Sequence, residues 1–151
     1  MSSESEMRND RTDIREIVGQ YFAALDLRDP KLMAGCFSED TVYKALDGEG
    51  GVYNGIADTV AVLMGVKVFT ATNHKASNVT INLKGDSADV VTFAIAHCLI
   101  GPIDSARILI RGLRYVDKFK RTPAGWRIAH RRHIPLWQYE TASVPLALPQ
   151  S

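Results

Sequence analysis

Four long runs of strand-forming residues, separated by short turns, fill the second half of the chain and limit the folds open to it. The runs are rich in Val, Ile, Thr, Phe and Tyr, and the segments between them read KGD, GPID and TPAG. Short connections of this kind join antiparallel neighbours in a sheet. We therefore predict an antiparallel meander made of residues 73–83, 87–100, 106–121 and 125–134.

The first half of the chain has the periodicity of helices. Apolar residues recur at helical spacing over 14–25, after a possible cap at Asp10 or Thr12. The Asp-Pro pair at 29–30 is a typical helix start, because proline loses no hydrogen bond at the first helical position. A third helix is expected over about 57–65.

This order of elements indicates the α+β class. We predict three helices from the first half of the chain, packed on one face of a cone-like curved sheet, antiparallel or mixed, that encloses a pocket. A length of 151 residues fits one domain. The expected division is a disordered tail over 1–9, a single domain over 10–140 and an irregular C-terminal tail over 141–151.

Charge and hydropathy exclude several classes of partner. The net charge of +1 gives no electrostatic basis for binding nucleic acid, and HRRH at 130–133 is the only dense basic cluster. No apolar run approaches the roughly 20 residues that a membrane span needs. The polar N-terminus does not read as a signal or transit peptide. We expect a soluble cytoplasmic protein.

His74 is the residue that fits its strand least well. It opens a run of Val, Thr, Ile, Ala and Asn, and a histidine there can be either a half-exposed surface residue or part of a site. Val79, Ile81 and Leu83 have the opposite parity to His74, so an unbroken strand would place its ring on the other face. A β-bulge between His74 and Val79 would bring it onto their face.

His97 lies in the run DVVTFAIAHCLI, where bulky residues alternate with small ones. We expect the bulky face to look inward, and His97 shares that face with Phe93 and Ile95. The pattern leaves open whether His97 is a core residue or part of a site. Asp26 likewise lies at the border of the first helix's apolar stripe, where a solvated carboxylate is the alternative to a functional one.

Other candidate residues are amphipathic or cationic. Tyr43 and Tyr115 could line a pocket, with core packing as the alternative. An arginine of the last strand, Arg131 included, could bind an anionic group if it pointed into the pocket. No spacing of His, Cys and carboxylates suits a metal, and no phosphate-binding loop or nucleophile elbow is present in the sequence.

Two segments together resemble a known family. IREIVGQYFAALDLRDPKLMAGCFSED resembles the opening of SnoaL-like proteins of the nuclear transport factor 2-like superfamily, and GWRIAHRRH resembles their closing strand. The resemblance covers about residues 12–133. It is greatest to the branch containing scytalone dehydratase and hexachlorocyclohexane dehydrochlorinase, which use an Asp–His dyad. It implies the same α+β cone.

Asp26 in ALDLRD and His74 in TNHKASNVTINL fall where that branch has its dyad. The resemblance therefore implies that His74 is a general base and that Asp26 holds its other ring nitrogen. It further implies catalytic roles for His97 and Tyr43. The positions of Tyr21, Tyr115 and Arg131 correspond to pocket residues. Leu25 stands where the dehydratase has a tyrosine, and Tyr21 where the dehydrochlorinase has a lysine, so a different substrate is expected.

The function that follows is a cofactor-independent lyase with dehydratase-like elimination, or an isomerase using the same proton transfers. The expected substrate is a hydrophobic cyclic small molecule. The alternative is a non-catalytic module of the same fold, which binds a ligand or acts as an oligomerisation module like the small subunit of a ring-hydroxylating dioxygenase. Such a subunit would have a filled pocket and a large apolar surface. In either case we expect a homo-oligomer, a dimer or a trimer.

Overall fold

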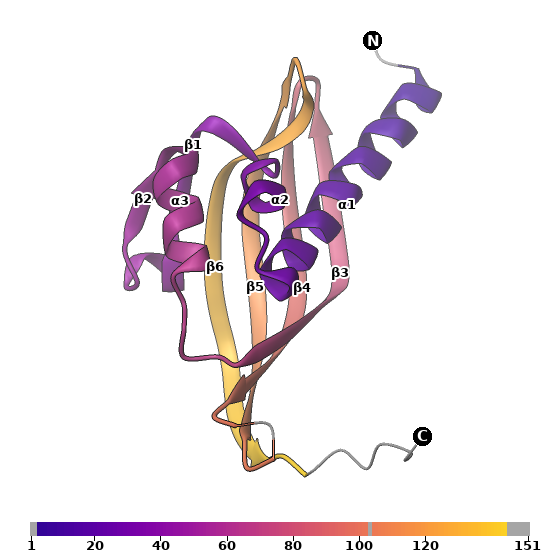
Figure 1. Ribbon diagram of the computed structural model, residues 1–151. Coiled ribbons are helices and arrows are strands. Elements are labelled where there is room, and N and C mark those ends of the chain that lie inside the picture. The colour runs from indigo at the N-terminus through magenta and orange to yellow at the C-terminus, as the bar shows by residue number, and fades with distance from the viewer. Residues whose placement is uncertain (1–2, 103, 145–151) are drawn as a thin grey trace, which may run out of the picture.

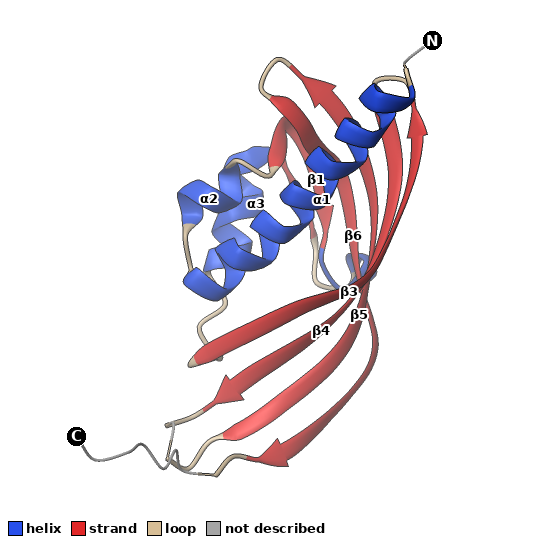
Figure 2. Cartoon of the chain, turned by 90° about the vertical axis from the view of Figure 1, so that its right-hand side faces the viewer, coloured by secondary structure: helices blue, strands red, loops and turns tan. Residues whose placement is uncertain are grey.

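One mixed sheet of six strands forms the body of the fold, with the helices against its concave face (Figures 1 and 2). The computed structural model describes residues 3–102 and 104–144. The strand order is β2-β1-β6-β5-β4-β3. The predicted α+β class, with three helices packed on a curved mixed sheet, is confirmed, and the sheet is not closed into a barrel.

The helices are α1 (Glu4–Leu27), α2 (Pro30–Ala34) and α3 (Gly55–Met64), and a short 3-10 turn, η1, spans Ala45–Gly48. The strands are β1 (Phe37–Lys44), β2 (Val52–Asn54), β3 (Ala71–Lys84), β4 (Ser87–Ile100), β5 (Arg107–Thr122) and β6 (Gly125–Ala142). The four predicted strands of the meander are β3 to β6. The sequence did not reveal β2, whose three residues are too few to show a period.

Helix α1 begins earlier than predicted. Its cap is Ser3, whose Oγ accepts a hydrogen bond from the Glu6 amide at 3.1 Å, while the Glu6 carboxylate accepts one from the Ser3 amide at 2.6 Å. This reciprocal capping box satisfies two amides at the helix start. Residues 4–9, predicted as part of a disordered tail, are therefore helical. Residues 1–2 lie outside the described part of the chain.

The apolar stripe of α1 holds the helix against the sheet. Ile14, Val18, Tyr21 and Phe22 are all at most 5% exposed. The edge of Tyr21 meets the ring of Tyr115 on β5, with 5.7 Å between centroids. Edge-to-face aromatic pairs of this kind add to the stabilisation that burial itself supplies. The stripe thus fixes where the last turns of α1 lie over the sheet.

A β-bulge interrupts β3 where the alternation of the sequence required one. Ala76 pairs with Ala94 and Val79 with Thr92, so Ser77 and Asn78 together face a single residue of β4. An extra residue changes which face the following side chains occupy. His74, on one side of the bulge, and Ile81, on the other, consequently share the concave face. The break that His74 would need in order to share a face with Val79, which the sequence left open, is present in the strand.

Strand β6 contains a second bulge. Lys118 pairs with His130 and Phe119 with Ile128, which leaves Ala129 as the extra residue. Simple alternation would place Ile128 and Arg131 on opposite faces. The bulge brings Arg131 and His133 onto the concave face with Ile128. Strand β6 also pairs in parallel with β1, which makes the sheet mixed.

The prediction that the bulky face of β4 looks inward was wrong. Its small residues face the helices, and Ala94, Ala96 and Cys98 are buried, whereas Phe93 is 39% exposed on the outer, convex face. The small side chains leave room for the aromatic residues of α1 and for a cavity. His97 shares the outer face with Phe93.

At the end of the chain β6 extends to Ala142, past the predicted domain limit of 140, and residues 145–151 of the predicted irregular tail lie outside the described part. Within residues 3–102 and 104–144, none of the helices combines the length and apolar character of a membrane span.

Candidate functional site

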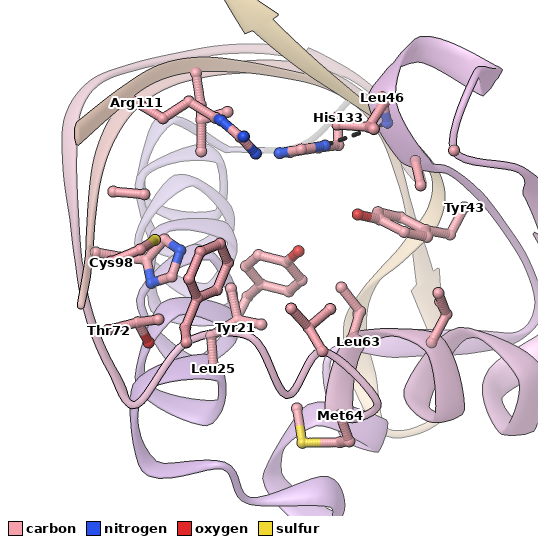
Figure 3. Close-up of a pocket in the computed structure, with 18 of the residues that line it drawn as sticks. Tyr21, Leu25, Tyr43, Leu46, Leu63, Met64, Thr72, Cys98, Arg111 and His133 are labelled. Atoms are coloured by element: carbon pink, nitrogen blue, oxygen red, sulfur yellow. Dashed lines mark hydrogen bonds between the residues drawn. The ribbon is translucent and has the colours of Figure 1, made fainter. Parts of the chain in front are cut away.

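A cavity of about 370 Å³ lies between the concave face of the sheet and the helices (Figure 3). This volume falls in the range of small-molecule sites. Strands β3 to β6 supply its floor, and the last turns of α1 and α3 cover it with apolar side chains. Its covering residues include Leu25, Leu63, Met64 and Phe69.

Asp26 and His74 come together at one end of this cavity. Oδ1 of Asp26 lies 2.6 Å from Nδ1 of His74, and Oδ2 accepts a hydrogen bond from the His74 amide at 2.8 Å. Because an ionised carboxylate only accepts, Nδ1 is the protonated ring nitrogen. Nε2 is then left without a proton. The pair thus meets the distance that a general base and its orienting carboxylate require.

Neighbouring side chains hold this pair in place. The hydroxyl of Thr72 donates to Oδ1 of Asp26 at 2.9 Å, so the carboxylate accepts three hydrogen bonds. The ring of Phe22 stacks on that of His74, with centroids 5.8 Å apart and planes 17° apart. The His74 side chain is 10% exposed and lines the cavity. Its ring is therefore oriented by both polar and apolar contacts.

His133 is a second histidine of the same cavity, and its Nδ1 has the opposite kind of partner. The backbone amide of Leu46 donates to Nδ1 at 3.3 Å. Since Nδ1 accepts, the proton of the neutral ring lies on Nε2. Burial, reinforced by the positive charges of Arg111 and Arg131, lowers the pKa of His133 to about 4. The ring is consequently neutral at physiological pH.

The backbone at Leu46 is unusual. Leu46 and Asp47 have φ values of 48° and 55°, in the left-handed region that non-glycine residues seldom occupy. Such residues cost about 1–3 kcal/mol each and cluster at functional sites. A bidentate ion pair from Arg132 to Asp47, at 2.8 and 3.0 Å, holds the turn. This turn presents the Leu46 amide to His133.

Three tyrosines face the cavity. Tyr21, Tyr43 and Tyr115 are each at most 4% exposed and all line it, as predicted for pocket residues. Burial raises the pKa of each phenol, most strongly for Tyr43 and Tyr115. They therefore remain protonated and able to donate. The Tyr43 hydroxyl points into the cavity (Figure 3).

Arg131 does not line the cavity, which corrects its predicted place among the substrate-binding residues. It is fully buried in a bidentate pair with Asp117, at 2.8 and 2.6 Å. Its guanidinium carbon lies 4.1 Å from the Tyr21 ring centroid and 4.6 Å from that of Tyr115. Burial opposes its charge, but the Asp117 carboxylate outweighs burial and raises the pKa of Arg131. Its position is behind the tyrosines, where it supports them.

His97 is also absent from the cavity, so its predicted place in the catalytic group is wrong. It pairs with Asn73 on β3 and Ile110 on β5, one residue out of phase with His74 and Arg111. The pleat therefore directs its ring to the outer face. The Nδ1 atom of His97 is buried and has no hydrogen-bond partner among the described residues.

The sequence did not single out Arg111 or His133, although both line the cavity. Arg111 shares its parity in β5 with Leu113 and Tyr115, and Tyr115 was already a pocket candidate. That parity was the available signal for Arg111. His133 could be placed only once the bulge at Ala129 was known. Among the described residues, no cluster of three or more His, Cys, Asp or Glu side chains could hold a metal ion.

Comparison with known sequences agrees with this architecture. A family model described as SnoaL-like domain matches residues 6–132. The uncharacterised proteins Mb2934c of Mycobacterium bovis and Rv2910c of Mycobacterium tuberculosis are each 32% identical to the chain over 134 residues. The match covers 86% of this chain and 88% of each relative.

Solved structures share the fold at low sequence identity. LinA is similar with a TM-score of 0.84 and 16% identity, over 98% of this chain and all of that one. A protein of Novosphingobium aromaticivorans with a provisional assignment as scytalone dehydratase has a TM-score of 0.72 and 21% identity, over 97% and 96% of the two chains. Another protein of that organism, provisionally an aromatic ring hydroxylase, has a TM-score of 0.77 and 20% identity, over 89% and 94%.

Proposed function

Because the chain belongs to the SnoaL-like domain family, we propose that it is a cofactor-independent lyase that removes water, or an isomerase that uses the same proton transfers. The observation that carries this proposal is the Asp26–His74 contact of 2.6 Å at the edge of an open cavity. A partly buried histidine oriented by a carboxylate is suited to taking a proton from carbon.

His74 is the general base in this proposal. Its Nδ1–H bond to Asp26 leaves the Nε2 lone pair available for a substrate proton. When Nε2 takes the proton, the ring becomes an imidazolium next to the Asp26 carboxylate. That charge pair stabilises the protonated form of the ring. Proton transfer by a positioned side chain contributes about 10²–10⁴-fold to a rate.

Tyr43 is a proposed hydrogen-bond donor to the substrate. Its hydroxyl is buried, protonated and directed into the cavity (Figure 3). Donation to an oxygen of the substrate would stabilise charge that develops as the proton leaves. Tyr21 and Tyr115 complete an aromatic wall against which a flat ring can pack.

The shape and lining of the cavity support a hydrophobic cyclic substrate. Most lining side chains are apolar or aromatic, and the volume of about 370 Å³ suits one or two fused rings. An open cavity also argues against the alternative of a subunit whose pocket is filled. A structure named hexachlorocyclohexane dehydrochlorinase (LinA) and the provisional scytalone dehydratase have names that denote elimination reactions, which supports the same class for this chain.

Homo-oligomerisation is proposed from the outer face of the sheet. Trp137 and Tyr139 stack there, with centroids 6.3 Å apart, and are 49% and 55% exposed. Phe93 is 39% exposed on the same face of β4. Exposed apolar clusters of this kind mark association surfaces. A second copy of the chain is the proposed occupant.

A screen in heavy water tests the enzymatic proposal. Hydroxylated cyclic compounds are incubated with the protein, and mass spectrometry reports loss of water and uptake of deuterium on carbon. Elimination gives the first signal and isomerisation the second. Both are expected to vanish in His74→Ala and to persist in His97→Ala, a histidine of the outer face. Turnover by His74→Ala at the wild-type rate would contradict the proposal.

A further inference from the structure

Helix α1 is terminated by Arg28, whose backbone conformation is one that glycine usually supplies. Its φ of 53° and ψ of 44° lie in the left-handed region. The Arg28 amide donates to the Leu25 carbonyl at 3.2 Å, and the Asp29 amide to the Ala24 carbonyl at 3.0 Å, which is the Schellman pattern of a helix end. A side chain at this position costs backbone stability that glycine does not. An arginine here therefore points to a use for its side chain.

The exposed part of the cavity lining marks the mouth of the cavity. Among the described lining residues it consists of Arg28, Leu46, Val66 and Val68, and the others are buried or half-buried. The three apolar residues of the mouth are 40–60% exposed. A ligand that enters the cavity therefore passes an apolar rim that carries the guanidinium of Arg28.

The segment of residues 65–70, which joins α3 to β3, holds this guanidinium at the mouth (Figure 1). Nη2 of Arg28 donates to the backbone carbonyl of Phe69, which also lines the cavity. Nε and Nη1 have no hydrogen bond with any described residue, so their N–H groups can donate to a ligand. Because one nitrogen is already anchored, the rigid fork loses less freedom when a ligand binds.

No carboxylate of the described residues forms an ion pair with Arg28. The two acidic residues nearest to it in the sequence have other partners. Asp26 is engaged with His74, and Oδ1 of Asp29 accepts from the Leu32 amide at 2.9 Å. The described lining of the cavity contains no acidic residue. The mouth thus carries a positive charge that an anionic ligand can neutralise.

We propose that Arg28 anchors an anionic group of the substrate, which is then an amphiphile with its ring inside the cavity and a carboxylate-like anion at the mouth. That this ligand is a substrate rests on the proposed function of His74, whereas its mode of binding does not. Arg28 follows Asp26 by two residues, so the end of one helix places both the anchor and the Asp26–His74 pair. Neutral rings of the same shape lack the contact with Arg28 and bind more weakly.

Desolvation favours this division of the ligand. A ring gains from burial in the apolar interior. An anion at the mouth keeps part of its hydration while it accepts charge-assisted hydrogen bonds from Arg28. Arg111, the other arginine of the lining, is half-buried, so an anion would lose more of its hydration there. The two parts of an amphiphile thus match the two parts of the cavity.

Two probes that differ in charge test the anchor. 4-(1-Naphthyl)butyrate and its primary amide share a ring and a chain, and isothermal titration calorimetry measures the dissociation constant of each. At low ionic strength the wild type should bind the carboxylate about 10-fold more tightly than the amide, because charge-assisted hydrogen bonds are stronger than neutral ones. High salt should reduce this preference by screening. Equal affinity for the two probes, or no detectable binding of either, overturns the proposal.

Substitutions of Arg28 assign the preference to its side chain. Arg28→Met keeps an apolar stem and should lose the preference while binding the amide as before. Arg28→Lys should retain part of the preference because the charge remains. Lys31→Met is the matched control and should bind both probes as the wild type does, since Lys31 is an exposed cation of α2 outside the cavity lining. A carboxylate preference that survives in Arg28→Met overturns the proposal.

Two further variants test where the probes bind and what Arg28 does for the fold. Ala96→Phe fills part of the cavity floor and should weaken both probes; unchanged affinities would place them elsewhere and overturn the proposal. Arg28→Gly relieves the left-handed backbone, so it should unfold at a temperature no lower than that of the wild type and yet lose the carboxylate preference. A clearly lower unfolding temperature would contradict the inference from backbone strain.

The binding test does not depend on catalysis, so the two proposals can fail separately. If the screen in heavy water gave no turnover while the wild type kept the carboxylate preference, the catalytic function would fail and the anchor would stand. If turnover that depends on His74 were found but the two probes bound equally, the anchor alone would fail.

Discussion

His74 and His133 line the same cavity, but their Nδ1 atoms face groups of opposite hydrogen-bonding character. A carboxylate oxygen of Asp26 lies 2.6 Å from one, and the amide of Leu46 lies 3.3 Å from the other. The neutral rings must then be opposite tautomers. One presents a bare Nε2 to the cavity, and the other presents an Nε2–H. Two residues of one type thus acquire the complementary properties of a base and a donor.

The first prediction concerns these tautomers. Nitrogen-15 NMR of the imidazoles above neutral pH should show His74 protonated at Nδ1 and His133 protonated at Nε2, because each Nδ1 partner permits only one assignment. Asp26→Asn should disturb the shifts of His74 and leave those of His133 unchanged. Identical tautomers at the two positions would contradict the hydrogen bonds described above.

The second prediction concerns Asp26. Asp26→Asn should lower the rate of proton abstraction by about 10²–10⁴-fold, because the amide neither holds the reactive tautomer firmly nor stabilises the imidazolium. Deuterium uptake by a turned-over substrate measures this rate. Thr72→Val, which removes one hydrogen bond to the carboxylate, should have a smaller effect in the same direction. Wild-type exchange by Asp26→Asn would show that the contact is structural only.

The third prediction concerns stability in acid. The pKa of His133 in the folded chain is about 4, below its ordinary value of 6.5, because burial disfavours the charged ring. The unfolded chain therefore binds the proton first as pH falls. His133 should remove stability progressively between about pH 6.5 and pH 4, by up to about 3 kcal/mol in full.

Urea unfolding at several pH values measures this loss. His133→Gln provides the comparison, because its amide can still accept from Leu46 but does not titrate. As the pH falls from about 6.5 to 4, the unfolding free energy of the wild type should decrease more than that of His133→Gln. Parallel curves for the two proteins would contradict a depressed pKa at His133.

The fold and the proximity of Asp26 to His74 could be predicted from the sequence for identifiable reasons. The period of α1 and the turns of the meander are local signals, and they placed α1 and the four long strands. Asp26 and His74 were proposed as a pair from the family resemblance, whereas alternation alone put His74 on the face opposite to Val79. That conflict argued against an inward His74 unless a bulge intervened, because a strand with a buried face cannot carry both residues on it otherwise. The bulge at Ser77 and Asn78 removes the conflict.

The errors arise where the sequence carries no such conflict. Nothing in the β6 sequence marks Ala129 as an extra residue, so the inward turn of His133 could not be read from alternation. For β4, hydrophobicity favoured the wrong face. The concave side holds the small residues Ala96 and Cys98, because α1 and the cavity occupy the space above them. His97 was misplaced for that reason.

The fourth prediction concerns the buried pair of Arg131 and Asp117. Asp117→Ala leaves a fully buried guanidinium without its carboxylate and should destabilise the fold by about 3–5 kcal/mol. Replacing both members by apolar residues should restore much of this loss. Glu140→Ala is the control, because its pair with Arg107 is exposed and worth less than about 1 kcal/mol. Denaturant unfolding measures the free energy of unfolding of the wild type, of Asp117→Ala, of the double apolar variant and of Glu140→Ala. Equal stability of Asp117→Ala and the wild type would contradict the prediction.

The fifth prediction concerns the outer face of the sheet. Trp137 packs over Gly112, where an added Cβ would lie 2.2 Å from the indole, and it stacks on Tyr139. A Trp137→Glu/Tyr139→Glu protein should lose self-association, since two carboxylates on this surface would face a second copy across an apolar contact. Light scattering coupled to size-exclusion chromatography measures the mass. Val68→Glu is the control, because Val68 is 60% exposed beside the cavity instead of on the outer face. A wild-type chain that is monomeric at high micromolar concentration would contradict the proposed oligomer, whatever the variants do.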